Sequence, residues 1–260
     1  MSVLNTLRRH PFVLDAWFEY SLVLTFAYPR AVLEPLLPPG LVLDTYEDYG
    51  FLAIALVQVR ELRPAGLPAA LGQRFFLSGY RLFTRYHTSR GKRLRGLFIL
   101  RSDTNQRRMA WLGGLTSHYQ FEHAQLISHV SPNEISLRLR TPAHHADLDL
   151  TAHLSGPAPL PPTSPFPDWA TARRFAGPLP FTFSPDADGR SMLLVEGQRE
   201  NWTPQPVAVT LREATFLHQP PFDTEPACLA NAFLIRDIPY RWRRGVLDLI
   251  PEPMLALSAL

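Results

Sequence analysis

FLSGYRLFTRYHT, residues 76–88, and LRGLFILRS, residues 94–102, are joined by the short segment SRGKR, residues 89–93. Two apolar, β-branched and aromatic runs separated by a glycine-containing turn predict a β-hairpin. The register depends on the turn, because a one-residue change moves every side chain to the other face. A two-residue turn at Gly91-Lys92 groups Tyr80 with Arg101 and Asp103 on one face, whereas a three-residue loop puts Arg81 opposite Asp103. The sequence leaves both registers open.

Most of the chain on both sides of this hairpin has the sequence pattern of β-strands. Predicted strands cover 20–28, 41–46, 51–60, 118–130, 134–140, 145–154, 192–196 and 207–216, and predicted short helices cover 30–37, 105–112, 168–175 and 224–232. About ten strands joined mostly by short connections, with about four short helices, indicate an α+β protein whose mostly antiparallel sheet is large enough to close into a barrel. We expect a single domain over 1–260, in which the proline-rich segment 156–167 is an extended crossing loop.

The composition narrows the class of protein. The 26 prolines against 14 glycines argue against a long helical bundle. A single cysteine, Cys228, excludes an intramolecular disulfide and any multi-cysteine metal site, and it fits a reducing compartment. The longest apolar run, 51–59, is far shorter than the roughly 20 residues of a membrane span. Asp15 and Glu19 interrupt the apolar segment after Arg8-Arg9, so we expect a cytoplasmic protein rather than a secreted one.

Candidate catalytic groups lie in Ser117-His-Tyr-Gln-Phe-Glu-His123. On a strand, His118 and Glu122 share one face, which makes them a candidate acid–base pair. Only one imidazole joins Glu122 there, too few for a closed metal site. A second cluster, residues 144–153, alternates His and Asp with apolar residues, which favours a strand with one solvated face over a metal site. We therefore expect no metal and no cofactor.

Two alternative functions stay open at this point. The proline-rich segment could dock on a partner, which would make the chain a non-catalytic interaction module. Arginines interleaved with aromatic residues over Tyr80–Tyr86 are typical of single-strand nucleic-acid binders, but a net charge of +3 makes nucleic acid a weak expectation. The oligomeric state is left open, with a homo-oligomer allowed.

An ordered series of motifs resembles a known family. The series consists of Arg30-Ala-Val-Leu-Glu-Pro-Leu-Leu-Pro-Pro-Gly-Leu-Val-Leu-Asp44, then Arg63-Pro-Ala-Gly-Leu-Pro68, then Tyr80-Arg81…Gly91-Lys92…Gly96-Leu-Phe-Ile-Leu-Arg-Ser-Asp103. It is similar to the YqjF-like family of uncharacterised proteins, of the acetoacetate decarboxylase-like superfamily, over roughly residues 15–130. The resemblance implies a cone-shaped, largely antiparallel β-barrel around a central pocket.

The resemblance also implies a chemistry that the residues contradict. The decarboxylase works through a lysine Schiff base, with a second lysine beside it that depresses its pKa. In the family this pair falls in the strand after the short helix, here about 116–123, and no lysine lies there. Lys92 is the only lysine of the chain, and the hairpin turn exposes it to solvent. The decarboxylase residues do not carry over.

These observations predict a lysine-independent barrel protein that binds a small anionic or carbonyl-bearing organic molecule in its cavity. We expect Arg81 to contact the anion and Asp103 to orient Arg81. His118 and Glu122 are the candidate acid–base groups. Whether the chain catalyses a reaction is left open.

Overall fold

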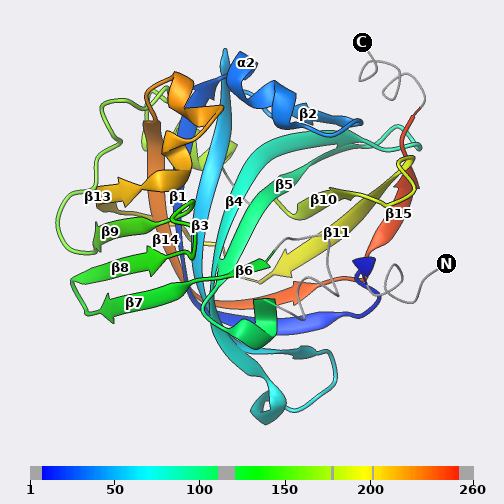
Figure 1. Cartoon of the computed structure of the whole chain (residues 1–260), viewed down its shortest axis with the longest axis horizontal. Coiled ribbons are helices and arrows are strands. Elements are labelled where there is room, and N and C mark those ends of the chain that lie inside the picture. Colours follow the sequence, from blue (N-terminus) through cyan, green and yellow to red (C-terminus); the bar gives the residue numbers. More distant parts are fainter. Residues whose placement is uncertain (1–7, 111–120, 177–178, 201, 252–260) are drawn as a thin grey trace.

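The computed structural model describes residues 8–110, 121–176, 179–200 and 202–251. An 11-stranded sheet dominates it (Figure 1). The strands on its main path are β12 (Gln205–Pro206), β14 (Cys228–Trp242), β1 (Leu14–Pro29), β3 (Tyr49–Pro64), β4 (Gln73–His87), β5 (Arg93–Thr104), β10 (Phe181–Pro185), β11 (Ser191–Arg199) and β15 (Val246–Leu249). The short strands β2 (Leu41–Leu43) and β6 (Phe121–His123) pair with β4 and β5.

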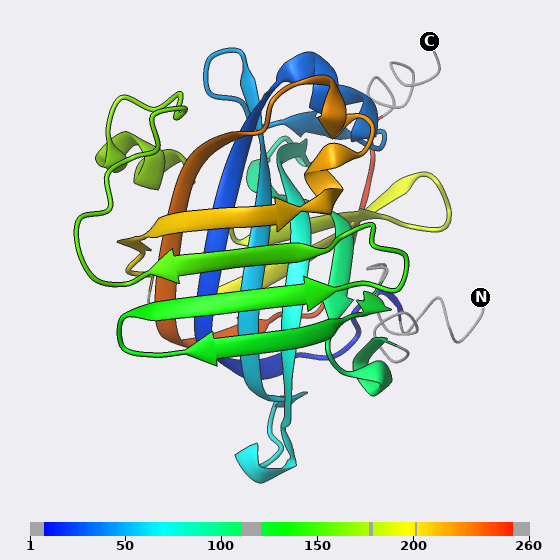
Figure 2. The same ribbon diagram turned by 60° about the vertical axis from the view of Figure 1, so that its left-hand side comes forward.

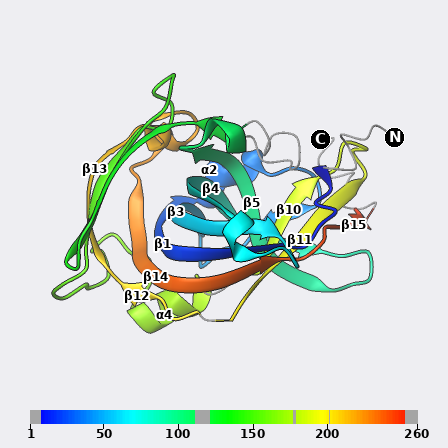
Figure 3. The ribbon, with the colours of Figure 1, turned by 90° about the horizontal axis from the view of Figure 1, so that it is seen from below.

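The pairing of this sheet runs in a ring. It passes from β14 through β1, β3, β4, β5 and β10 to β11, and β11 pairs again with β14, where Gly197 lies opposite Trp242. The long strands curve around a common interior when the molecule is seen from below (Figure 3). Most of these pairs are antiparallel, and β5–β10 is parallel. The predicted fold class, mostly antiparallel with few short helices, is confirmed.

A second sheet covers one side of the ring. Its order is β13 (Ala208–Ala214), β9 (Leu148–His153), β8 (Glu134–Arg140) and β7 (Gln125–Val130), all antiparallel. Its strands cross in front of β1, β3 and β4 (Figure 2). One hydrophobic cluster fills the space between the sheets, with Leu22, Ile54 and Tyr80 from the ring and Leu137 and Leu150 from the second sheet. The single predicted sheet is therefore two sheets.

Strands β1 and β3 carry unbroken apolar runs because both of their faces are buried. Residues 20–28 of β1 and 50–58 of β3 are buried or nearly so, with 58 the least buried. One side of each strand joins the cluster under the second sheet, and the other side joins a cluster inside the ring that includes Val23, Ala55 and Phe233. Such continuous runs are expected where a strand has no solvent face.

The segment after the prolines packs into the interior. Helix α4 (Trp169–Phe175) begins as predicted at Asp168, whose side chain accepts a hydrogen bond from the Thr171 N–H at 2.7 Å. Phe166 stacks on Phe51, with ring centroids 5.3 Å apart, and Phe175 packs against both rings. This aromatic cluster fills the interior on the α4 side, so the proline-rich crossing loop ends in buried core.

Two predictions need correction. The predicted helix over 224–232 is wrong: Thr224 only ends the 3-10 helix η4 (Phe222–Thr224), and β14 begins at Cys228 and pairs with β1 through positions such as Thr25–Asn231. The hairpin of β4 and β5 is confirmed, but Asp103 lies opposite Ser78 and Arg81 lies opposite Ile99. The connection 88–92, closed by a bond from the Thr88 N–H to the Lys92 carbonyl, puts Arg81 opposite Ile99, and a bulge between Tyr80 and Arg81 shifts the pairing beyond it by one residue. The short described helices include none long and apolar enough to cross a membrane.

Candidate functional site

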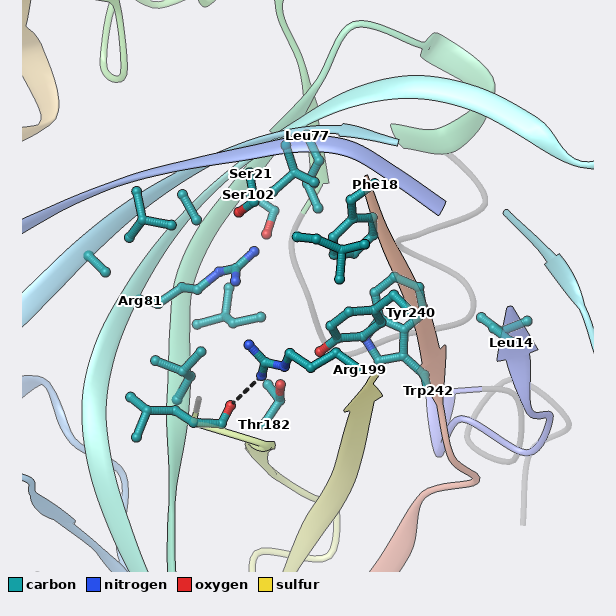
Figure 4. Close-up of a pocket in the computed structure, with 18 of the residues that line it drawn as sticks. Leu14, Phe18, Ser21, Leu77, Arg81, Ser102, Thr182, Arg199, Tyr240 and Trp242 are labelled. Carbon is teal, nitrogen blue, oxygen red and sulfur yellow. Dashed lines mark hydrogen bonds between the residues drawn. The ribbon is translucent and has the colours of Figure 1, made fainter. Parts of the chain in front are cut away.

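The interior of the ring contains a pocket of about 320 Å³. Strands β1, β3, β4, β5, β11 and β14 supply most of its lining, and most of the lining side chains are apolar. The polar groups that face it include His10, Ser21, Arg81, Ser102, Thr182, Arg199 and Tyr240 (Figure 4). Among the described lining residues there is no aspartate and no glutamate. The pocket thus combines apolar walls with an excess of positive charge.

Arg81 projects into the pocket from the middle of β4. Its inward orientation follows from strand alternation, since Phe75, Leu77 and Phe83 on the same face also line the pocket. The guanidinium folds back over Gly79, where an added Cβ would lie 2.8 Å from Arg81 Nε. Glycine at position 79 therefore makes room for this arrangement. Figure 4 shows the guanidinium beside Ser21 and Ser102.

Arg199, at the end of β11, is the second cation of the pocket. Its guanidinium carbon lies 4.2 Å from the ring centroid of Trp202 and 5.5 Å from that of Tyr240. Its Nη2 donates a hydrogen bond to the Leu179 carbonyl oxygen at 3.2 Å, drawn as the dashed line in Figure 4. Gly197 allows the Tyr240 ring to approach, because an added Cβ would meet the phenol oxygen at 1.9 Å.

Arg199 differs from the other buried charges of the protein. Burial lowers the pKa of Arg199, and no ion pair among the described residues gives Arg199 a carboxylate. A guanidinium nevertheless stays protonated at any physiological pH. Figure 4 shows Arg81 and Arg199 extending into the same space from different strands. Chemically, this arrangement can bind the oxygen atoms of a carboxylate or a similar anion.

His10 lines the pocket near the start of β1. Burial lowers the pKa of His10, against hydrogen bonds with the backbone that favour the charged form. Since a free imidazole titrates near pH 6.5, lowering its pKa leaves the His10 ring neutral at neutral pH. The positive charge of the pocket therefore comes from its arginines.

Asp103 is not the group that faces Arg81 across the hairpin. Its fully buried carboxylate accepts hydrogen bonds from Ser78 Oγ and Arg101 Nε, each at 2.9 Å. Burial raises the pKa of Asp103, and the bonds from Arg101 and Ser78 oppose this shift. Asp103 lies next to Ser102, which lines the pocket, and so it points to the opposite face of the sheet. The register that puts Arg81 opposite Asp103, one of the two that the sequence left open, therefore does not form.

The candidate acid–base pair is only partly described. His118 lies outside the described residues. Glu122 in β6 forms an ion pair with Arg101 at 2.7 Å, and its side chain is 51% exposed. Phe121 lines the pocket, so its neighbour Glu122 points away from the pocket. Glu122 is therefore not placed to act as an acid or base in the pocket.

The aspartates of the second cluster are engaged by arginines. Asp149 accepts bonds from Arg138 Nε at 2.8 Å and from Arg212 Nε at 2.7 Å. Asp147 accepts from the Thr141 N–H at 2.7 Å. Within the described ranges, no group of three or more His, Cys, Asp or Glu side chains is placed to hold a metal ion.

The arginine and aromatic run over Tyr80–Tyr86 is not an exposed stacking surface. Tyr80 and Tyr86 are fully buried, and the Nε of Arg85 donates to Asp44 at 2.5 Å. Stacking of bases requires accessible rings, so this run offers no platform for a nucleic acid. Lys92, in the turn between β4 and β5, is exposed and does not line the pocket.

Sequence reasoning missed Arg199. The strand predicted over 192–196 stops three residues before it, whereas β11 continues to Arg199. Gly197-Gln198 at that point is typical of a strand end. A signal existed in the arginine itself, because it follows an apolar strand and is followed closely by Trp202, a frequent cation–π partner.

Solved structures share the fold at low sequence identity. An acetoacetate decarboxylase from Legionella pneumophila matches with a TM-score of 0.54 and 13% identity, over 91% of this chain and 87% of that one. An acetoacetate decarboxylase-like enzyme from Sphingomonas wittichii matches with a TM-score of 0.56 and 12% identity, over 94% of each chain. A third structure, from structural studies of acetoacetate decarboxylase, gives 0.53 and 13%, over 91% and 89%.

These similarities establish the fold of the decarboxylase-like proteins for this chain. No curated protein matches the sequence. A family model, DUF2071, described as an uncharacterized conserved protein (COG2071), matches residues 16–234. This range takes in the ring from β1 to the first half of β14 and the whole second sheet. The chain therefore belongs to the DUF2071, YqjF-like family, within the acetoacetate decarboxylase-like group of folds.

Proposed function

We propose that this protein binds a small organic carboxylate in the interior of its ring. The observation that carries the proposal is Arg199, a buried cation of the pocket to which no ion pair among the described residues gives a carboxylate, with Arg81 as a second inward arginine. A cation inside a largely apolar pocket loses hydration, and an acidic partner is the usual compensation. A ligand carboxylate would supply that partner from outside the chain.

The pocket walls suggest the rest of the ligand. Val23, Ala55, Leu77 and Phe233 present aliphatic and aromatic surface to the space beside the arginines. A volume of about 320 Å³ is at the low end for ligand pockets. The ligand class that fits is a carboxylate with a short aliphatic or aromatic body.

The proposal excludes imine chemistry. The only lysine, Lys92, is exposed in a hairpin turn outside the pocket lining. Without an amine in the pocket, a β-ketoacid can be held by charge and hydrogen bonds but cannot form a Schiff base with the chain. We therefore propose binding without acetoacetate decarboxylase activity. The single cysteine supports a reducing, cytoplasmic setting.

The test is a calorimetric titration with octanoate and benzoate. We expect binding to the unmodified protein and a loss of roughly 30-fold or more in Arg81→Met, as for the removal of one partner of a partly desolvated charge pair. The matched control is Arg236→Met, since Arg236 is an exposed arginine of β14 outside the pocket lining. Absent binding of both probes, or equal binding by the Arg81 and Arg236 variants, would refute the proposal.

A further inference from the structure

A pair of buried polar residues lies inside the ring beyond the arginines. Thr25 of β1 and Asn231 of β14 are direct partners in the antiparallel register, and they are 0% and 1% exposed. Three of their side-chain atoms, Thr25 Oγ1, Asn231 Nδ2 and Asn231 Oδ1, have no hydrogen-bond partner among the described residues. Buried polar atoms without partners are rare and cost stability.

Both side chains face the interior that contains the pocket. Val23 and Phe233, two residues away on the same strands, line the pocket, and strand alternation puts Thr25 and Asn231 on that face. Ala53 of β3 also lines the pocket, and it lies opposite Thr25 on one side and Arg81 on the other. Ala53 is thus the direct neighbour of both Thr25 and Arg81 in this row across the sheet, while Thr25 and Asn231 themselves lie outside the described pocket lining.

We infer that Thr25 and Asn231 form a second subsite that binds an uncharged hydroxyl, carbonyl or amide group of the ligand. This inference rests on the proposed function, in which the arginines hold the carboxylate of the same molecule. A hydroxyl can donate to Asn231 Oδ1 and accept from both Asn231 Nδ2 and Thr25 Oγ1, so one such group can pair with all three atoms. Apolar side chains would suffice at both positions if the pair served packing alone.

The sheet geometry sets the spacing between the two polar ends of the ligand. Thr25 is two strands from Arg81, which corresponds to about 10 Å between their backbones. The Arg81 guanidinium folds over Gly79, away from the row that contains Thr25. The ligand class is therefore a carboxylate whose second polar group follows an apolar chain of roughly six to eight carbons.

Matched pairs of probes test the subsite directly. Alkanoates of four to ten carbons and the corresponding ω-hydroxyalkanoates are titrated into the full chain by calorimetry. We expect the hydroxyl to increase affinity on the order of tenfold at one intermediate chain length, since a site built for a hydroxyl rejects the analogue that lacks it. In Thr25→Val and Asn231→Leu, the plain alkanoate should still bind while the hydroxyl preference disappears.

Thermal unfolding without ligand supplies a second readout. Thr25→Val and Asn231→Leu replace orphan atoms by apolar groups of similar size, so we expect melting temperatures equal to or about 2 °C above that of the unmodified protein. The control Thr151→Val should lower it, because Thr151 is a buried threonine of the second sheet whose Oγ1 is bonded to Ser136 and Arg212.

The outcomes separate this inference from the proposed function. If alkanoates bind through Arg81 but no ω-hydroxyl group improves binding at any length, the inference is overturned and the proposed function stands. Lower melting temperatures for Thr25→Val and Asn231→Leu, comparable to that of Thr151→Val, would also overturn it. If no alkanoate binds at all, the proposed function fails and this inference fails with it.

Discussion

Replacing Arg199 by methionine should separate ligand binding from folding stability. The substitution keeps an unbranched side chain and removes the guanidinium, whose carbon lies over the rings of Trp202 and Tyr240. It loses the cation–π contacts, about 1–2 kcal/mol, and the bond to the Leu179 carbonyl, about 1.5 kcal/mol. It also relieves a desolvated charge for which the described residues give no carboxylate, a gain of several kcal/mol at most.

These opposing contributions leave a small net effect on folding. We expect the free energy of unfolding of Arg199→Met to stay within about 1–2 kcal/mol of the unmodified value, a shift of no more than about 4–8 °C in melting temperature. Binding should respond far more, because the guanidinium is opposed by the ligand anion alone. A loss of about 2–3 kcal/mol corresponds to roughly 30- to 150-fold in Kd for octanoate.

Urea unfolding and calorimetric titration of the same protein samples measure both quantities. A variant that loses more than about 3 kcal/mol of stability would show that Arg199 holds the fold together, as a buried ion pair does. Unchanged octanoate affinity in a stable variant would show that Arg199 does not contact the anion. Either result would refute the assignment of Arg199 to the ligand.

Three further predictions follow from other groups. Borohydride treatment with acetoacetate should leave the mass of the protein unchanged, because the pocket lining lacks a lysine. An adduct at Lys92 whose amount increases with the acetoacetate concentration, in the low-concentration range, would contradict this. Asp44→Asn should cost about 2–4 kcal/mol in urea unfolding and leave octanoate affinity unchanged, because the Asp44 side chain is fully buried between Arg85 and Arg95 and is not part of the pocket lining; a weakened Kd would contradict it. Burial lowers the pKa of His10, so the unfolded chain takes up the proton at a higher pH than the folded chain does, and the free energy of unfolding should fall as the pH drops below about 6.5. His10→Phe should reduce this fall. An equal slope of unfolding free energy against pH in both proteins would rule out His10 as the cause.

The sequence predicted the elements that are set by residues close together in the chain. The hairpin of β4 and β5 follows from two β-rich runs and a glycine turn, and the start of α4 follows from Asp168 as its cap. The inward Arg81 was predicted from the family resemblance together with its place as a polar residue on a largely apolar strand. Its register relative to Asp103 was not predictable, since the sequence leaves the length of the turn open and a bulge between Tyr80 and Arg81 shifts the pairing by one more residue.

The missed parts of the site depend on contacts between distant segments. Thr224 and Pro226 are typical helix-start residues, yet β14 forms at Cys228 because β1 offers it a long apolar partner. That error hid Asn231, which matters only as an inward-facing strand residue opposite Thr25. Closure of the ring through the β5–β10 and β11–β14 pairs likewise joins segments far apart in the chain. Periodicity reports the faces of one element and does not report which elements meet.

A crystal structure with octanoate bound at saturation tests the central claim most directly. The account predicts density for the ligand inside the ring, with its carboxylate within hydrogen-bonding distance of the Arg81 and Arg199 guanidinium groups and its chain along Val23 and Phe233. Octanoate on the outer surface, with the interior pocket unchanged, would contradict it.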